Sequence, residues 1–294
     1  MEKYIKPALI ANAATLGIHW IYDPKYLAEL NRKQDILFLV QNKETYNKAK
    51  VAFYSYPNHK IGDVSVQGEI LKWLYKAMKD NANFTLDDYD ALLFSYFKPG
   101  GLYQGYVESY ALKNVINKIG TNLNLKVEKE SLDDDHLVGF IPYLVCRELN
   151  LSSSKAWSLA QIFTKNKDYF MFYEMFDAIL DSIGTKDKKT CIKDAIKKAP
   201  KKYLDALNKA IELDDTDEFI EKYSGRACAI NQSIPLIIHL LYHIDSYEEA
   251  VRKNALIGGA ISDRNLLLGA VLAQISDIPK FGQKKYFSLQ LVIN

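Results

Sequence analysis

The chain has 294 residues, of which 48% are hydrophobic, enough for a sizeable core in one large domain or two small ones. Its 38 basic and 36 acidic residues nearly balance, so no strong electrostatic field favours nucleic acid or a membrane surface as the partner. The three cysteines are far apart and form no CxxC pair, which indicates neither a disulfide framework nor a zinc site. We therefore expect a folded globular protein whose partner is a small-molecule ligand.

The N-terminal segment lacks the features of a targeting signal. Charged residues precede a short apolar run, but no small-residue cleavage site follows, and Trp20, Tyr22 and Asp23 come soon after it. No run approaches the roughly 20 apolar residues that a membrane helix needs. These features predict a cytoplasmic protein with reduced thiols and no membrane partner.

Helical spacing runs through most of the sequence. In VQGEILKWLYKAMKD, residues 66–80, apolar side chains recur at intervals of three and four. In DSYEEAVRKNALIGG, residues 245–259, Ser246 and Glu249 form a capping box and Gly258 ends the helix. Only DILFLV, residues 35–40, resembles a short strand, although another helix fits as well. Further helices are expected at residues 2–18, 87–98, 105–119, 136–149, 153–164, 169–182, 190–197, 201–213, 216–222, 232–243 and 264–275.

The near absence of period-two runs predicts an all-α fold. No repeat of 20 to 50 residues, low-complexity segment or Pro/Gly/Ser linker divides the chain, so we expect a single domain over residues 1–294. The lysine-rich stretch at 186–202 lacks interleaved aromatic residues, which favours a solvated helix face over a nucleic-acid site.

Four segments combine glycine, acid or histidine residues near predicted helix ends: residues 11–24, 62–69, 131–136 and 258–264. An all-α fold can bring such helix ends together at one crevice. In the second segment, Asp63 and Glu69 flank a helix start, where acids either serve a site or simply complement the helix dipole.

Three further acidic or histidine patterns have ordinary structural explanations. The aspartates at 133–135 either cap the next helix or bind a hard cation through carboxylate oxygens. The string Asp214-Asp215-Thr216 lies between two helical patterns and predicts an N-cap. His239 and His243 have the spacing of paired metal ligands, but the glutamate of an HExxH motif is missing, which favours two ordinary helix histidines.

The opening stretch ANAATLGIHWIYDP, residues 11–24, resembles the ADAxxxPLHWIYD segment of the ADP-ribosylglycohydrolase family, in its branch related to the lens J-type crystallins. GDVSVQGE (62–69) is similar to its GDxTxYGxQ segment, and GYVESYALKNVINKIG (105–120) to its GYxDxATxxTLxN helix. SLDDDHLVGFIPYLV resembles its acid-rich segment before a helix, and GRACAINQSIPLIIHLL (225–241) its CxxPQAxP run. The matches keep their order over residues 8 to about 280.

The resemblance implies an all-α domain whose active members hold two magnesium ions between acid and hydroxyl ligands. These ions bind ADP-ribose and help to cleave the bond at its anomeric carbon. Metal-held water and a carboxylate would then supply the nucleophile and proton transfer.

The sequence departs from this pattern at two ligand positions. Asn12 replaces an aspartate of the opening motif, and GGAISDR has Ala260 where the first aspartate of GGDxxxR stands. Losing that carboxylate argues against a two-ion site and leaves one magnesium ion or a weakened pair. Arg264, at a helix start behind two glycines, is suited to a diphosphate or else buttresses the turn.

Two hypotheses follow from these residues. The first is a divergent hydrolase that acts on a glycosidic bond to ADP-ribose or a related nucleotide-ribose, free or attached to an ADP-ribosylated substrate. The second is a non-catalytic nucleotide-binding or crystallin-like structural protein of the same fold. For the first we assign catalysis to Asp63, Glu69 and Asp135, ligand binding to Gly258, Gly259, Ser262, Arg264 and His19, and metal binding to Asp63, Asp134 and Asp263.

Overall fold

The computed structural model describes residues 2–81, 83–123 and 135–279. Within these ranges the regular elements are helices, with only isolated β-bridges beside them, which confirms the predicted all-α class. The α-helices are α1 (Ile5–Thr15), α2 (Pro24–Lys33), α3 (Lys43–Lys48), α4 (Val66–Lys79), α5 (Leu86–Phe97), α6 (Ser109–Asn122), α7 (Ile141–Glu148), α8 (Ser153–Ala160), α9 (Asp168–Ser182), α10 (Lys188–Ile196), α11 (Leu204–Glu212), α12 (Thr216–Tyr223), α13 (Ile230–His243), α14 (Tyr247–Ile257) and α15 (Ile261–Leu272). Short 3-10 turns lie at Leu16–Ile18, Leu137–Phe140 and Lys201–Tyr203.

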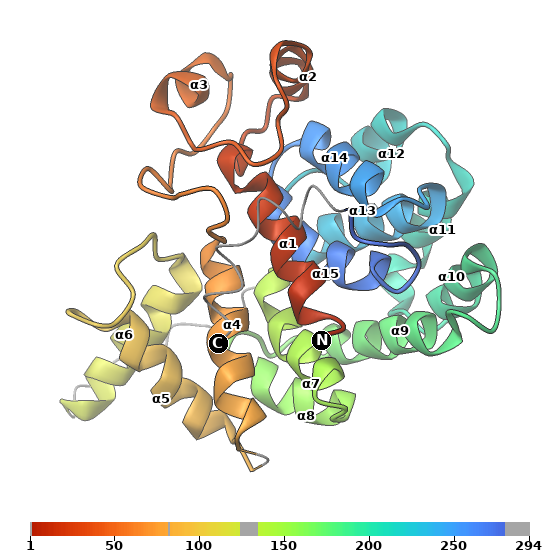
Figure 1. The fold of residues 1–294 in the computed structure, drawn as a ribbon. Coiled ribbons are helices and arrows are strands. Elements are labelled where there is room, and N and C mark those ends of the chain that lie inside the picture. The colour runs from red at the N-terminus through yellow and green to blue at the C-terminus, as the bar shows by residue number, and fades with distance from the viewer. Residues whose placement is uncertain (1, 82, 124–134, 280–294) are drawn as a thin grey trace.

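Helices α1 and α15, from opposite ends of the chain, lie side by side at the centre of the molecule (Figure 1). Gly269 permits this close approach, because a Cβ atom there would lie 2.7 Å from the Ala11 Cβ and 2.9 Å from the Pro7 carbonyl oxygen. Helices α4 and α14 pack against the same pair, and α5 pairs with α6 beside α4. The central pair thus joins the early and late segments that the sequence singled out.

Buried apolar side chains from Tyr4 to Leu272 form one hydrophobic cluster. Every residue of α15 is buried, including its polar ones. The Asn265 side chain donates to the Ala11 carbonyl and to the Thr15 hydroxyl, and Asn254 donates to the Asn265 side chain. Because buried polar groups cost free energy unless they are paired, this network lets polar residues occupy the core.

Several predicted elements match the structure closely. Helix α4 begins after Ser65, whose hydroxyl accepts from the Gly68 N–H, and α14 lies between the Ser246 cap and Gly258. The Asp215 carboxylate accepts from two N–H groups in the first turn of α12, which confirms the predicted N-cap.

Three predictions of local structure are wrong. Residues 35–40 form neither a strand nor a helix but a turn, in which Phe38 has a φ of 60° and donates its N–H to the Ala14 carbonyl. Helix α6 begins at Ser109, four residues later than expected, which leaves Glu108 as its N-cap. Helix α15 begins at Ile261, three residues earlier than expected, which puts Asp263 in its first turn.

Two helices were not predicted. Helix α2 has a clear start signal, because the Asp23 carboxylate accepts from the Tyr26 N–H and Pro24 occupies the first position. Helix α3 is only six residues long, too short for its apolar periodicity to show. No helix in the described ranges combines the length and hydrophobicity needed to cross a membrane.

Candidate functional site

The glycine pair after α14 lies against the loop that follows the first 3-10 turn. Gly258 and Gly259 have φ values of 87° and 77°, a conformation that disfavours residues with a Cβ atom. The Gly259 N–H donates to the Ile21 carbonyl at 2.8 Å, and the Trp20 N–H donates to the Gly259 carbonyl at 2.9 Å. A Cβ on Gly259 would lie 2.0 Å from the Arg226 carbonyl oxygen. Both glycines are therefore needed to join these segments at the start of α15.

Asp263 lies at this junction, only 1% exposed, and is held by Ser65, the N-cap of α4, which Asn12 of α1 contacts in turn. The Ser65 hydroxyl donates to Asp263 Oδ1 at 3.0 Å. Asn12 in turn donates from Nδ2 to the Ser65 hydroxyl (2.8 Å) and to the Ser262 carbonyl (2.9 Å). An aspartate at position 12 has no such donor, so the amide found here fits the arrangement around Asp263.

His19 faces the second oxygen of this carboxylate. The Ser262 N–H donates to His19 Nδ1 at 3.1 Å, so in the neutral ring the proton lies on Nε2. That nitrogen is 3.5 Å from Asp263 Oδ2, and the side chains of both residues are fully buried. The backbone of α15 thus orients His19 toward the acid.

Glu108, at the start of α6, is a second buried acid that the sequence analysis did not single out. Burial raises the pKa of its carboxyl well above the usual value, and the nearby charge of Asp263 raises this pKa further. His136 and the Gln67 amide, which lies near the carboxyl without a well-formed hydrogen bond to it, oppose the shift by lowering this pKa. The two acids therefore belong to one electrostatic group, in which the protonated form of Glu108 is favoured.

The buried polar group around these acids has unsatisfied atoms that face inward. Among the described residues, His19 Nε2, Asp263 Oδ2, Glu108 Oε1 and both polar atoms of the Gln67 amide have no hydrogen-bond partner. Such atoms are rare in a folded protein, and each calls for an explanation such as a bound water, an ion or a role in catalysis. We call His19, Gln67, Glu108 and Asp263 the acid cluster.

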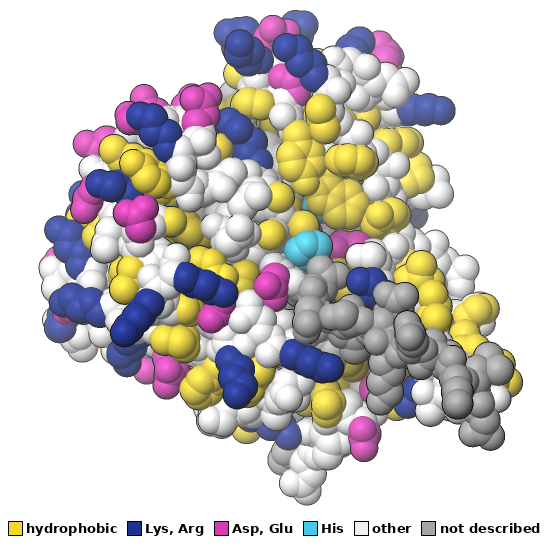
Figure 2. Space-filling view, turned by 180° about the vertical axis from the view of Figure 1, so that it is seen from behind, with side chains coloured by type: hydrophobic (Ala, Val, Ile, Leu, Met, Phe, Trp, Pro, Cys, Tyr) yellow, Lys and Arg dark blue, Asp and Glu magenta, His cyan; other side chains and the backbone are white. Residues whose placement is uncertain are grey.

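Aromatic side chains near the acid cluster also line a surface cavity of about 420 Å³. The His19 ring stacks on Trp20 with centroids 4.6 Å apart, and Tyr106 contacts both Trp20 and Tyr56. Tyr56 and Tyr106 line the cavity, and Tyr56 also feels the charges of the two buried acids. Figure 2 shows one face of the molecule on which a histidine lies beside acidic side chains, below a group of hydrophobic ones; this histidine is not His19, whose side chain is fully buried. Aromatic surfaces next to convergent polar groups are typical of small-molecule sites.

The predicted catalytic acids lie apart from the acid cluster. Asp63 is exposed and accepts from the Lys60 N–H, while Glu69 forms an ion pair with Lys72; both border the 420 Å³ cavity. The Asp135 carboxylate accepts from Thr164 and Asn166, in the connection between α8 and α9. The predicted metal ligand Asp134 lies outside the described residues.

Arg264 is fully buried and bonded within the protein. Its guanidinium donates to the Asn254 side chain at 2.8 Å, to the Arg226 carbonyl at 2.8 Å and to the Gly258 carbonyl. Burial lowers its pKa to about 10. These contacts fix the glycine turn from inside, as predicted by the alternative in which Arg264 buttresses the turn. The ligand-binding role of Arg264 stays a prediction.

Two of the predicted metal ligands, Asp63 and Asp263, lie in different surroundings. In the ranges that the structure describes, no three His, Cys, Asp or Glu side chains are grouped so as to hold a metal ion. Asp63 is exposed, while Asp263 is enclosed by Ser65 and His19. As arranged, these two carboxylates do not form one ligand set for magnesium, and the magnesium prediction stays a prediction because Asp134 is not described.

The histidine pair on α13 has ordinary structural contacts. Within hydrogen-bond distance, His239 Nδ1 is 2.9 Å from the Ala210 carbonyl oxygen and Nε2 is 3.1 Å from the Thr216 hydroxyl. His243 also approaches the Ala210 carbonyl, at 3.1 Å. The interpretation as two ordinary helix histidines agrees with this geometry.

No family model matches the chain, and no curated protein matches it significantly. The family assignment therefore stays a proposal based on the motif resemblance.

Proposed function

We propose that the protein is a divergent hydrolase that cleaves a glycosidic bond to ADP-ribose or a related nucleotide-ribose. The motif resemblance supports the substrate class. The observation that carries the chemistry is the acid cluster, in which two buried carboxyl groups have different surroundings. Such pairs divide the roles of acid and base in glycoside cleavage.

In the proposed mechanism Glu108 is the general acid. Because burial favours its protonated form, it gives a proton to the leaving nitrogen or oxygen as the bond to the anomeric carbon breaks. Asp263 stabilises the positive charge that develops on the ribose and accepts a proton from the attacking water. The hydroxyl of that water bonds to the anomeric carbon. His19 and Ser65 act as positioning residues for Asp263.

The cavity and its aromatic wall are proposed to bind the nucleotide part of the substrate. Trp20 and Tyr106 are both partly exposed and contact each other with ring centroids 5.4 Å apart. Trp20 has a φ of 65°, a strained conformation for a tryptophan that the hydrogen bond to Gly259 holds in place. A volume of about 420 Å³ lies within the usual range for small-ligand sites.

The test is hydrolysis of an ADP-ribosylated peptide and of free ADP-ribose conjugates by the purified protein, with product detected by chromatography. We expect Glu108→Gln to lower kcat by on the order of 100-fold or more, and to remove the fall in rate that the wild type shows as pH rises through the raised pKa of Glu108. The matched control is Glu29→Gln, an exposed glutamate on α2. Failure of every such substrate to bind or react would contradict the proposal.

A non-catalytic ligand-binding protein of the same fold is the second candidate. Ala260 and the internal hydrogen bonds of Arg264 favour it, because they remove groups that the family motif offers to a ligand. Calorimetric titration with ADP-ribose distinguishes the two candidates: binding without any turnover in the hydrolysis assay supports the second.

A further inference from the structure

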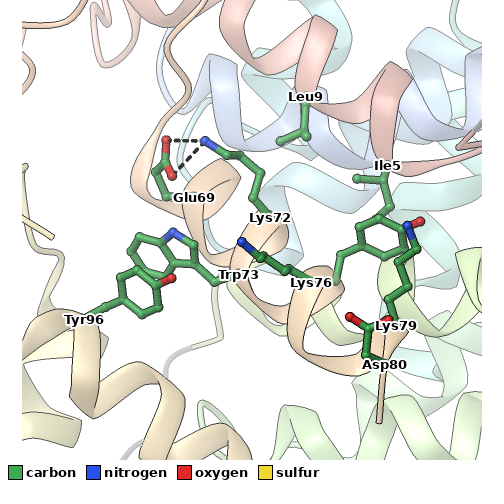
Figure 3. A pocket seen from close by; sticks show the side chains of 10 residues that line it. Ile5, Leu9, Glu69, Lys72, Trp73, Lys76, Lys79, Asp80 and Tyr96 are labelled. Carbon is green, nitrogen blue, oxygen red and sulfur yellow. Dashed lines mark hydrogen bonds and ion pairs between the residues drawn. The ribbon is translucent and has the colours of Figure 1, made fainter. Parts of the chain in front are cut away.

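A second cavity, of about 390 Å³, lies between α1, α4 and α5 and is separate from the acid cluster (Figure 3). Three lysines of α4 line it, at positions 72, 76 and 79, a spacing of four and three that puts them on one helix face. Glu69 and Asp80 are the acids that border it, so cations outnumber acids there.

The three lysines differ in the interactions that their ammonium groups make within the protein. Lys72 forms an ion pair with Glu69, at 2.9 Å. Lys79 lies over the Tyr75 ring, 6.0 Å from its centroid. Lys76 is exposed and has no ion pair among the described residues. In the view of Figure 3 its ammonium group points toward Trp73, on the same side as Lys72. Lys76 is thus available to an anionic group, and Lys72 becomes available when its ion pair with Glu69 opens.

The rest of the lining is aromatic and aliphatic. Trp73 and Tyr96 stack almost parallel, with centroids 3.8 Å apart and planes 9° apart, so each ring fixes the other and has only its outer face left for a ligand. Ile5 and Leu9 of α1 line the cavity from another side. A ligand that combines a charge with a flat apolar group complements this lining better than a simple ion does.

We propose that this cavity binds an organic phosphate with an aromatic group. The phosphate contacts Lys72 and Lys76, and the aromatic group packs on the outer face of Trp73, which Tyr96 supports from behind. The site does not depend on the proposed hydrolase activity, because none of these four residues belongs to the acid cluster.

Glu69 connects this site to the candidate active site, since it borders both cavities. A phosphate at Lys72 competes with the Glu69 carboxylate for the same ammonium group. Binding therefore weakens the ion pair and frees the Glu69 carboxylate, which also faces the 420 Å³ cavity. This exchange gives an organic phosphate a direct way to alter the charge that lines the other cavity.

Calorimetric titration with phenyl phosphate tests the proposal, with phenol and inorganic phosphate as reference ligands. We expect saturable binding of phenyl phosphate, about tenfold weaker in both Lys72→Gln and Lys76→Gln, because each change removes a charge-assisted contact. Glu69→Gln should bind more tightly, because it removes the competitor. Lys25→Gln, at an exposed lysine on α2, is the matched control.

Trp73→Leu separates the aromatic contact from the charge. This variant should weaken phenyl phosphate binding and leave that of inorganic phosphate unchanged, with folding checked by circular dichroism. Absence of binding to the wild type, or equal affinity in the wild type and in the two lysine variants, would overturn the proposal. An unchanged affinity for phenyl phosphate in Glu69→Gln would overturn the proposed competition between the phosphate and the Glu69 carboxylate.

Discussion

Two buried histidines, His239 on α13 and His19 beside α15, have opposite kinds of surroundings. His239 stacks on Phe219 with centroids 4.7 Å apart, and both of its ring nitrogens lie within hydrogen-bond distance of a protein oxygen. His19 stacks on Trp20 and accepts from the Ser262 N–H, but Nε2 faces a carboxylate without a hydrogen bond. His239 is therefore fully paired within a packed core, whereas His19 directs one ring nitrogen toward a buried acid.

From this difference we predict which buried polar groups serve stability and which serve the proposed activity. A group with all its partners supplied by the protein contributes to the native state and has little capacity left for chemistry. A buried group with an unpaired polar atom lowers stability and calls for a reason, such as a role in the proposed chemistry. Changes near His239 should therefore alter unfolding, and changes near His19 should alter activity.

The largest expected effect is on catalysis. Asp263→Asn keeps an acceptor for the Ser65 hydroxyl but removes the charge that faces His19. We expect kcat to fall by on the order of 100-fold or more, with a melting temperature close to that of the wild type. The hydrolysis assay and a thermal melt measure the two quantities. Equal activity in this variant would end the assignment of Asp263 as a catalytic residue.

Gly259→Ala should have the largest effect on stability. The new Cβ atom would lie 2.0 Å from the Arg226 carbonyl oxygen at a φ of 77°, so the turn that positions Asp263 must move. We expect a loss of about 3 kcal/mol or more in the free energy of unfolding. Gly184→Ala is the matched control, because its φ is 90° but nothing lies within 4 Å of the added atom; its loss should be about 1 kcal/mol. Equal losses in both variants would show that steric contact at Gly259 is unimportant.

A pH titration of the free energy of unfolding should isolate the contribution of His239 protonation to stability. Burial lowers the pKa of His239 to about 4, so below pH 6.5 the unfolded chain takes up a proton that the folded chain refuses. Stability from this source is complete above pH 6.5 and is lost as the pH falls toward 4. Between pH 7 and 5 the wild type should lose about 2 kcal/mol more than His239→Gln in urea unfolding. Parallel losses in the two proteins would contradict this.

The smallest effect is expected for Thr216→Val, which removes the hydroxyl next to His239 Nε2 and keeps the shape of the side chain. Unfolding should become easier by about 1 kcal/mol, and activity should stay unchanged. Thr121→Val, an exposed position on α6, controls for the substitution itself. A loss of activity in Thr216→Val would contradict the prediction that the surroundings of His239 serve stability and not activity.

Much of the fold could be predicted from the sequence, because local signals decide it. The Asp215 cap, the Ser65 start of α4 and the Gly258 stop of α14 all act within a few residues, and the structure confirms each of them. The error at residues 35–40 has a physical reason as well: the buried run Ile36–Phe38 folds as a turn because the Phe38 N–H bonds to the carbonyl of Ala14, a residue far away in sequence.

The candidate site is different, because its residues are collected by packing. The sequence by itself determined that glycine, histidine and acid residues gather at helix ends and that His19 and Asp263 are candidates. Only the tertiary structure decided that Asp263 faces His19, that Asp63 stays exposed and that Glu108 joins the buried group. Burial and charge proximity depend on how α1, α4, α15 and the residue before α6 are placed in the fold, and no local pattern in the sequence encodes that placement.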